Sequence, residues 1–538
     1  VTLISGTTGR AVANNLFEVS TANSLTGTQA SDLVGSSDVV ELANGNFVVH
    51  SPNWDNGSTV NSSAVTLVSG TTGRAVANSS FVVSTSNSLH GTQTSDAVGN
   101  GEIVALANGN FVVGSQNWDN GSTVNSGAVT LVSGTTGRAV IDSLFAVSTA
   151  NSLHGTTTSD IVGSKITVLA NDNYVVLSQS WNDGATTDVG AVTLVNGSGA
   201  NAGKAVADNL LVVSTTNSFH GTTSGDKVGR GNTTEELSNG NYIVRSDQWN
   251  NGATTDVGAV TLINGATGRA LVDSSFNIST SNSLHGTTIG DTVGSDVTVL
   301  ANDNFVVGSQ SWDNGGIINA GAVTLVSGTT GKAVTDDSFI VSSANSLHGT
   351  TTSDFVGTSI TELTSGNYVV RNSNWSNGGL TTAGAITLVN GTTGKAVGDN
   401  SFIVSTSNSV VGTSSGAATT VIAIDTTNNT FAAQFKDNTT NRVRIGFTDA
   451  DLAFANAGSN SATITSGFIT STLNAGTAVT LQASNDITIN SDIIVNNGSG
   501  DGGDLSLEAG RSILINADIT TDNGNFTAIA NDLLANGV

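Results

Sequence analysis

Apolar and polar residues alternate in short runs along most of this chain, and turn-forming pairs separate the runs. Residues 103–113 read Ile-Val-Ala-Leu-Ala-Asn-Gly-Asn-Phe-Val-Val, two β-rich runs joined at Asn108-Gly109. An Asn-Gly pair suits a type I′ hairpin turn, in which both central residues need a positive φ. A third run, Gly-Ala-Val-Thr-Leu-Val, ends before Gly-Thr-Thr-Gly, and a fourth resembles residues 80–89. The pattern predicts four antiparallel strands in a meander.

This four-strand pattern recurs through the chain. Its most regular marker is a Trp, found at Trp54, Trp118, Trp181, Trp249, Trp312 and Trp375. The spacings are 64, 63, 68, 63 and 63 residues, so one unit is about 64 residues long. Four-stranded antiparallel units in series are typical of β-propeller blades. The alternative is a parallel β-solenoid or another stacked array, although solenoid coils are shorter and do not use two-residue hairpins.

The two ends of the repeat region complement each other. The chain begins with a third and a fourth strand, expected at Val1–Ile4 and Leu16–Ser20, without a first and second. Residues 419–435 read as a hairpin resembling the two missing strands, turning at Asn428-Asn429. Closure would remove exposed sheet edges. We therefore expect an all-β fold with a seven-bladed propeller over residues 1–445, its last blade joining residues 1–20 with 419–436.

The pattern changes in the last part of the chain. Residues 478–493 align with residues 504–519 at a shift of 26, and a shorter third copy begins at Asn525. Short alternating strands with this period suit the coils of a right-handed parallel β-helix. We expect residues 446–538 to form such a segment, which continues in a longer parent protein.

Composition narrows the classes of function. The net charge is −25, with only 16 basic residues, which is unfavourable for nucleic acid because no phosphate-neutralising face is present. No apolar run approaches the roughly 18 residues of a membrane span, so we expect no direct membrane insertion. The chain has no Cys and no Met. It therefore has no disulfides, and we expect it to be processed or excised from something longer.

The sequence shows three resemblances to known families, two in the repeats and one near its end. The motif Ser-Leu-His-Gly, with Asp-x-Val-Gly, Leu-Ala-Asn-Gly-Asn-Phe-Val-Val and Gly-Ala-Val-Thr-Leu-Val after it, resembles the FG-GAP repeats of integrin-α-like propellers. That family often binds calcium in its first hairpin, but the hairpin here has few carboxylates. The unit also resembles repeats of unknown function in very large bacterial surface proteins. Residues 505–532 resemble filamentous-haemagglutinin-type exoproteins, which implies a secreted adhesin or surface fibre.

A His and an Asp six residues apart recur in one motif. The pairs are His90 and Asp96, His154 and Asp160, His220 and Asp226, His285 and Asp291, and His348 and Asp354. The first unit has Thr26 and Asp32 instead. Catalysis does not need a His five times, so we expect a structural corner in which the imidazole bonds to nearby backbone or to the Asp. A metal or ligand site is the alternative.

Two other sets are candidate ligand-binding residues. The six Trp could pack between blades or, as an exposed ring, stack on sugar faces. One cation per unit follows a Thr-Gly or Ala-Gly pair, giving Arg10, Arg74, Arg138, Lys204, Arg269, Lys332 and Lys395. These cations could pair with the repeating Asp side chains between blades, or form a cationic ring for an anion or acidic glycan.

Signals for catalysis and metal binding are weak. Residues 412–416 match Gly-x-Ser-x-Gly, but a Ser/Thr-rich loop replaces the strand and helix that a nucleophile elbow needs. We expect no enzyme and no resident cofactor. Calcium is the one cofactor considered, because residues 498–504 resemble a β-roll turn and contain Asp501 and Asp504.

The sequence thus predicts a non-enzymatic extracellular bacterial protein, an adhesin or a structural surface fibre. Its expected partners are a glycan or protein on a host or neighbouring cell, or copies of itself in a fibre. The alternative is a glycan-binding module that uses the Trp or the Arg/Lys ring.

Overall fold

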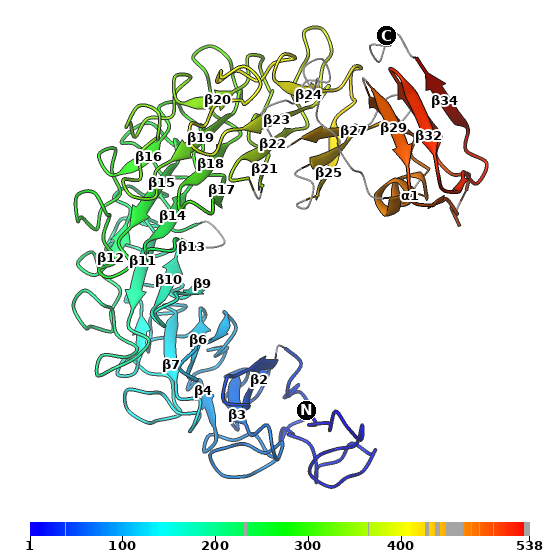
Figure 1. The fold of residues 1–538 in the computed structure, drawn as a ribbon. Coiled ribbons are helices and arrows are strands. Elements are labelled where there is room, and N and C mark those ends of the chain that lie inside the picture. The colour runs from blue at the N-terminus through cyan, green and yellow to red at the C-terminus, as the bar shows by residue number, and fades with distance from the viewer. Residues whose placement is uncertain are drawn as a thin grey trace. The chain divides into compact units, whose positions relative to one another are not determined.

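The computed structural model describes residues 1–37, 39–230, 234–363, 365–425, 430–435, 442–447, 466–474, 476–483, 485–498 and 500–531. The chain, coloured from its N-terminus to its C-terminus in Figure 1, divides into two compact units, Val1–His285 and Gly286–Val538. This division falls inside the repeats and not at the boundary near residue 445 that the sequence predicts.

The repeats contain six four-stranded antiparallel sheets, each with its strands in sequence order. In the first unit they are β1 (Val39–Glu41), β2 (Phe47–Ser51), β3 (Ala64–Val68), β4 (Ser88–His90); β5 (Ile103–Ala105), β6 (Phe111–Ser115), β7 (Ala128–Val132), β8 (Ser152–His154); β9 (Lys165–Val168), β10 (Tyr174–Ser178), β11 (Ala191–Val195), β12 (Ser218–His220); β13 (Glu235–Glu236), β14 (Tyr242–Ser246), β15 (Ala259–Ile263) and β16 (Ser283–His285). In the second unit they are β17 (Asp296–Val299), β18 (Phe305–Ser309), β19 (Ala322–Val326), β20 (Ser346–His348); β21 (Ser359–Glu362), β22 (Tyr368–Asn372), β23 (Ala385–Val389) and β24 (Ser409–Val411). The predicted meander is confirmed, and the parallel solenoid is wrong for this region.

The hairpin turn differs from the predicted type. Gly109 has a φ of 85°, but Asn108 is not among the residues with positive φ. Gly109 N donates to Leu106 O (3.1 Å) and Leu106 N donates to Asn110 O (2.8 Å), which closes a three-residue loop. Such loops need a positive φ at one position only. This explains why some units use Asp172 or Asp303 there, with φ of 66° and 64°.

The fourth strand is much shorter than predicted. In the first complete repeat only Ser88–His90 pairs with β3, whereas the sequence suggested a strand from residue 80. The Asn87 side chain explains the difference, because its Nδ2 donates to Val82 O (2.9 Å) and its Oδ1 accepts from Ser84 N (2.9 Å). These bonds hold residues 82–87 in a tight loop.

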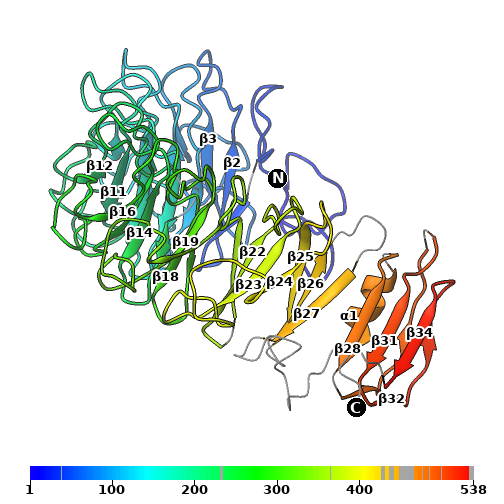
Figure 2. The same ribbon diagram turned by 90° about the horizontal axis from the view of Figure 1, so that it is seen from above.

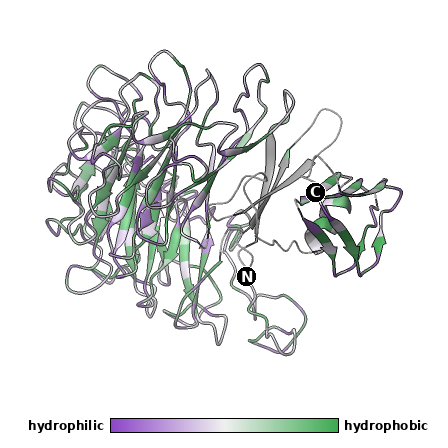
Figure 3. Cartoon of the chain, turned by 45° about the horizontal axis from the view of Figure 1, so that its top comes forward, coloured by the Kyte–Doolittle hydropathy of each residue, from purple (hydrophilic) through white to green (hydrophobic). Residues whose placement is uncertain are grey.

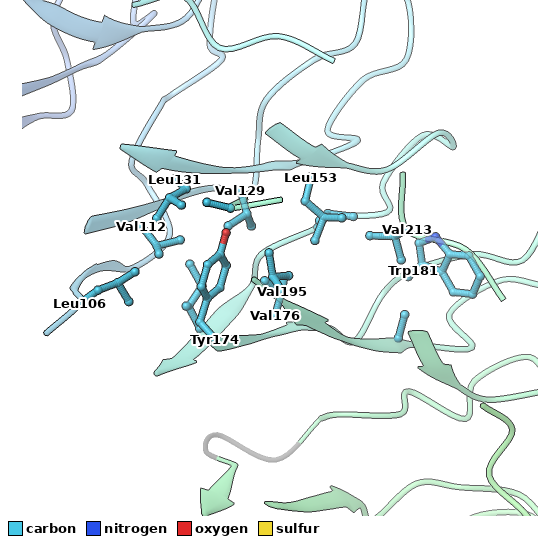
Figure 4. Packing of buried hydrophobic residues seen from close by; sticks show 14 of the residues in the cluster. Leu106, Val112, Val129, Leu131, Leu153, Tyr174, Val176, Trp181, Val195 and Val213 are labelled. Atoms are coloured by element: carbon cyan, nitrogen blue, oxygen red, sulfur yellow. The ribbon is translucent and has the colours of Figure 1, made fainter. Parts of the chain in front are cut away.

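Successive sheets pack face to face within each unit. Every residue of β6 and β7 is buried, since both faces of the sheet are covered. One shared core joins β6–β8 to β10 and β11, and Figure 4 shows Val129 and Leu131 facing Tyr174 and Val195. Hydrophobic colouring lies mainly along the strands in Figure 3.

The C-terminal region has a different pairing. Strands β25 (Thr419–Asp425), β26 (Thr430–Phe435) and β27 (Arg442–Phe447) are antiparallel, and α1 (Ser466–Asn474) follows. Further strands pair in parallel, as Figure 2 shows for β28, β31 and β34. They are β28 (Val479–Ala483), β29 (Asp486–Ile489), β30 (Ile493–Ile494), β31 (Leu505–Ala509), β32 (Ser512–Ile515), β33 (Ile519–Thr520) and β34 (Phe526–Ala530). We call β28–β34 the parallel stack.

The parallel stack has the predicted period. Val479 pairs with Leu505, Asp486 with Ser512, and Ile493 with Ile519, each 26 residues apart. Three short parallel ladders therefore connect one turn of chain to the next. The sequence did not indicate α1, whose Ile469 and Leu473 belong to the core of the stack.

The strand pairing of the described residues does not confirm the predicted closure by residues 419–436. A second blade strand must pair with a third strand, here at residues 1–4. Strand β26 is already paired along both edges, with β25 and with β27. Among the N-terminal residues, Thr2 bridges Ser24 without forming a longer strand.

Candidate functional site

The recurring Asp ties one repeat to the next. Asp96 Oδ2 accepts from the backbone N–H groups of Thr92 (2.6 Å) and Gln93 (2.8 Å), and its Oδ1 accepts from Asp119 N (3.1 Å). Asp119 directly follows Trp118 in the next repeat. The same three bonds recur at Asp32, Asp160, Asp226, Asp291 and Asp354. Each carboxylate is therefore engaged with backbone donors.

The glycine after each His makes room for this Asp. A Cβ on Gly155 would lie 2.6 Å from the Cβ of Asp160 and 2.5 Å from Ser126 O. Real Cβ atoms do not approach other atoms so closely, so a side chain would push the carboxylate off its donors. The Gly in the motif is thus explained by the corner.

The recurring His bonds to backbone and not to the Asp. His90 Nδ1 donates to Ser88 O (2.9 Å), and His154 and His220 repeat this bond. His348 instead donates to Gly349 O (2.9 Å). His285 belongs to the same set and contacts the ring of Trp249. The expected hydrogen bond from the imidazole to nearby backbone is confirmed where it is described. This geometry is that of a structural corner.

Each of these His packs against the Trp of its own repeat, edge-on in four repeats and tilted for His348. The ring centroids of Trp118 and His154 lie 6.3 Å apart at 73°, and Trp54, Trp181, Trp249 and Trp312 have similar partners. All six Trp are 3–4% exposed. The rings therefore lie in the interior, as the packing interpretation requires, and they present no face to a sugar.

Burial of Trp has a cost that packing must exceed. The Nε1 atoms of Trp54, Trp118, Trp181, Trp249 and Trp375 are buried without a described hydrogen-bond partner. An unpaired buried donor costs about 1–3 kcal/mol. A Trp buries about 150–250 Å², which contributes roughly 4–6 kcal/mol at about 25 cal/mol per Å². The balance favours a packing role.

Burial also shifts the pKa values of the His and Asp side chains in the corner. It lowers the pKa of His90, His154, His220 and His348, and the backbone acceptor only partly offsets this. Burial raises the pKa of Asp96, Asp160, Asp226, Asp291 and Asp354, and their backbone donors oppose the shift. Burial thus favours the neutral form of these four His side chains, each of which is hydrogen-bonded to a main-chain oxygen.

The recurring cations lie over aromatic rings within their own repeats. The Arg74 guanidinium lies 4.0 Å from the ring centroid of Phe81, and its Nη1 donates to Ser79 O (3.0 Å). Arg10, Arg138, Arg269, Lys332 and Lys395 face a Phe in the same way. At Lys204 the corresponding residue is Leu211.

These cations do not show the predicted pairing with Asp between blades. Among the described residues, the one ion pair of this set joins Lys332 to Asp337 (3.0 Å) inside a single repeat. The side chains are half-buried, so an aromatic face and a backbone carbonyl satisfy the charge locally.

Comparison with known families assigns the repeats. Seven segments match the family described as "Repeat of unknown function (DUF5650)": residues 1–36, 41–100, 105–164, 168–230, 236–295, 299–358 and 362–420. Together they cover about three quarters of the chain. The chain belongs to this family. The seven copies agree with the seven cations, and the first copy is the partial one.

Other comparisons add little. No curated protein matches the chain. Solved structures with some similarity include hydrazine synthase of Kuenenia stuttgartiensis (10% identity, 78% of this chain, 97% of the other, TM-score 0.29). Another is PorZ, described as a bacterial surface component of the type-IX secretion system of Porphyromonas gingivalis (12% identity, 78% of this chain, 47% of the other, TM-score 0.26). A third is a Dyadobacter fermentans protein of unknown function (11% identity, 65% of this chain, 92% of the other, TM-score 0.25). Similarities this low carry no argument.

The DUF5650 repeats also use residues that sequence reasoning missed. The Asn that opens the His motif, for example Asn151, donates to Ala146 O (2.9 Å) and to Asp142 Oδ2 (2.9 Å). Its Oδ1 accepts from Ser148 N (3.0 Å) and Ser152 Oγ (2.8 Å). The signal was present, because an Asn occupies this position in all seven copies, from Asn23 to Asn408.

A second missed residue is the Gly after the third strand. A Cβ on Gly134 would lie 1.7 Å from the carbonyl oxygen of Gly109 at the hairpin turn. Gly70, Gly197, Gly265 and Gly391 face the same clash. The Gly at this position lets the turn pack on the end of the third strand.

The calcium candidates are engaged elsewhere in the parallel stack. Asp504 Oδ1 accepts from Asn525 N (2.7 Å), and Asp501 Oδ1 accepts from Asn523 Nδ2 (3.2 Å). Both bonds connect one turn of the stack to the next. Within the described ranges, no group of three or more His, Cys, Asp or Glu is placed to hold a metal. A calcium ion here stays a prediction.

No helix among the described residues is long and apolar enough to cross a membrane. In sum, the site residues make a corner that joins repeats, built from Asp, Gly, His, Asn and Trp. Its chemistry is hydrogen bonding to main chain and aromatic packing.

Proposed function

We propose that this chain is a non-catalytic structural part of an extracellular bacterial adhesin or surface fibre. The DUF5650 repeats would form its rigid module, and the parallel stack would begin a β-helical stalk. The observation that carries the proposal is the corner, because each of its recurring polar groups is bonded to main chain or packed within the array. Such a site joins repeats, and it leaves no nucleophile or base directed at solvent.

Two sequence features support an extracellular place. The chain lacks Cys and Met, so it has no sulfur to oxidise. Residues 505–532 resemble filamentous-haemagglutinin-type exoproteins. The parallel stack, with its 26-residue period, is compatible with that resemblance.

Labelling of intact cells tests the location. Antibodies against the purified chain are applied to unpermeabilised and permeabilised cells of the source organism, with immunogold detection, and a second sample is treated with external protease. We expect labelling and protease loss on intact cells. Labelling that appears only after permeabilisation would contradict the proposal.

Glycan binding is the second candidate, and the cations are the part of it that the structure favours. The Trp rings are buried, but the Arg and Lys heads are half-exposed and held in fixed positions over Phe. A row of such cations could bind an acidic glycan.

An array of acidic glycans tests this candidate. Arg138→Ala should weaken binding, whereas Lys165→Ala, which removes a cation outside the set, should not. Equal binding by both variants, or binding by neither the variants nor the unmodified chain, excludes the candidate.

A further inference from the structure

Asn-Gly pairs recur at three places in the repeats, with one further pair at Asn100-Gly101. The hairpin pairs begin at Asn44, Asn108 and Asn239, and the strand-end pairs begin at Asn196, Asn264 and Asn390. The third set begins two residues after a Trp, and we call its members the turn pairs: Asn56, Asn120, Asn251, Asn314 and Asn377, each with the Gly that follows. All the pairs share one dipeptide, so differences in their chemistry must come largely from the fold.

In the hairpin and strand-end pairs, the N–H of the Gly is hydrogen-bonded. Gly109 N donates to Leu106 O (3.1 Å) in a hairpin pair, and Gly197 N donates to Asn173 Oδ1 (3.2 Å) in a strand-end pair. Gly101 N donates to Gly114 O (3.1 Å). Equivalent bonds of 2.9–3.2 Å are made by Gly45, Gly240, Gly265 and Gly391. These nitrogens are therefore engaged and held away from other reactions.

The turn pairs leave the same N–H free. Asn120 N donates to Thr123 O (3.0 Å) and Thr123 N donates to Asn120 O (3.0 Å), so Gly121 and Ser122 form a two-residue turn. Gly121 has a φ of 63°, as a type II′ turn requires at its first central position. Of the hydrogen bonds that the described residues make, none uses the N–H of the Gly in a turn pair: Gly57, Gly121, Gly252, Gly315 and Gly378.

The Asn side chains of the turn pairs are also weakly held. In the described part of the chain, the side chains of four of them make no hydrogen bond: Asn56, Asn120, Asn251 and Asn377. Asn314 makes one long contact, with its Nδ2 3.5 Å from His348 Nδ1. In the hairpin pair, by contrast, Asn108 Nδ2 donates to Gly197 O (3.0 Å) and its Oδ1 accepts from Asn110 N (3.0 Å).

Water has access to the turn pairs. Asn251 is exposed, and the other four Asn are half-buried. A Cβ on Gly121 would meet nothing within 4 Å, and the same is true at the other four turn glycines. The space beside the glycine nitrogen is therefore open to the Asn side chain and to solvent.

One repeat already carries an acid at this turn. Asp183 takes the place of the Asn, and it makes the same two backbone hydrogen bonds with Thr186 (3.0 Å each). Burial lowers the pKa of His220, and the Ser218 carbonyl and the Asp183 carboxylate oppose this shift. The turn thus accepts a carboxylate without losing its hydrogen bonds, and a charge there acts on the His of the corner.

We propose that the five turn pairs are deamidation sites. The Gly nitrogen attacks Cγ of the Asn side chain, so that an N–Cγ bond forms and the Cγ–Nδ2 bond breaks. Ammonia leaves and carries away the proton of the Gly N–H. Water then opens the five-membered succinimide ring at one of its two carbonyl groups, which gives aspartate or isoaspartate. Water is the sole co-reactant, and the reaction does not depend on where the protein resides.

Timed incubation of the full 538-residue chain at neutral pH tests the proposal. Peptide mass spectrometry gives the rate of amide loss at each Asn-Gly pair, and electron-transfer fragmentation separates isoaspartate from aspartate. We expect the turn pairs to react roughly fivefold faster than the hairpin and strand-end pairs, because a backbone hydrogen bond must first break in those sets. In concentrated urea the rates should converge, since every pair has the same two residues.

Two variants of the third complete repeat give a matched comparison. Asp183→Asn makes a new Asn-Gly pair at the turn, and Asp172→Gly makes one with Asn171 at the hairpin. We expect the first new pair to lose its amide as fast as the other turn pairs, and the second as slowly as the other hairpin pairs.

Two results would overturn the proposal. One is amide loss in the folded chain that is no faster at the turn pairs than at the hairpin pairs, in the unmodified chain or between the two variants. The other is a difference that persists unchanged in urea, since it would then come from neighbouring sequence and not from the turn. Surface labelling of cells can succeed or fail in either case, so this proposal and the proposed function are tested separately.

Discussion

The repeats and the parallel stack join neighbouring units in opposite ways. In the repeats, sheets meet face to face, so every residue of β6 and β7 is buried, and within each unit one short backbone bridge links a repeat to the next. In the stack, turns meet edge to edge through continuous ladders, and burial alternates along β31. Order between repeats thus depends mainly on side chains, whereas order between turns depends mainly on backbone. This is why the repeats keep a strict motif and the stack needs only alternation.

Removal of a core side chain from each region gives the largest expected effects. Trp118→Ala should cost about 3–5 kcal/mol and Leu507→Ala about 2–5 kcal/mol, because each leaves a cavity in a packed core. Hydrogen exchange should show lost protection in residues 41–164 for the first variant and in the stack for the second. A loss spread equally over both regions would mean that they do not unfold separately.

A methyl group at the hairpin contact should be nearly as harmful. Gly134→Ala places a Cβ against Gly109 O, and we expect a cost of about 3 kcal/mol from the forced backbone shift. Gly316→Ala is the matched control, since nothing lies within 4 Å of its Cβ, and it should change stability by less than about 0.5 kcal/mol. Denaturant titrations measure both. Equal midpoints would show that the close contact is not needed.

Loss of one corner carboxylate should have an intermediate effect. Asp160→Asn turns an acceptor into a donor among three backbone N–H groups, which should cost about 1–3 kcal/mol. Asp256→Asn is the control, because other repeats carry Asn61, Asn125 and Asn319 at that position. Melting curves of the two variants give the comparison. An unchanged melting temperature of Asp160→Asn would show that the corner carboxylate does not help to join the repeats.

Acid should weaken the repeats by a smaller amount. The folded state lowers the pKa of His154, so below the ordinary value of about 6.5 the unfolded chain binds more protons and the free energy of unfolding falls. The raised pKa of Asp160 acts with the opposite sign, because between about 3.9 and its folded value acidification favours the folded state.

A natural substitution isolates the His contribution. His154→Val copies Val411 of the last repeat, and it should reduce the loss of stability between pH 7 and pH 5 in denaturant titrations. An unchanged pH dependence would show that this imidazole is protonated as easily in the folded state as in the unfolded chain. The parallel stack contains no His, so its own unfolding should not show this loss.

Much of this fold could be predicted from the sequence because the same strand and turn pattern recurs in every repeat. Six Trp at even spacing gave the unit, and the hairpins gave antiparallel order. The period of the stack followed from one alignment at 26 residues. The short fourth strand was missed because residues 80–89 have strand composition, while the Asn87 side chain bends them into a loop.

The partners of the polar side chains were harder to predict. The His and Asp of one motif lie six residues apart, yet the His bonds to its own strand and the Asp reaches the next repeat. The cations looked available for Asp, but in six of the seven copies the cation lies over the Phe seven residues later. Spacing along the chain does not specify contacts between repeats, because these depend on how two sheets face each other.

The uniformity of the interfaces has a consequence for the gene. Deletion of one whole unit, such as residues 105–167, brings His90 to the segment that His154 now meets, and the new junction uses the same hydrogen bonds as the old one. Unequal recombination between copies can therefore shorten or lengthen the array without creating a misfit. An insertion whose length is not a multiple of the unit would place an Asp where no backbone N–H group can bond to it. Selection should therefore keep length changes in this coding sequence to whole repeats.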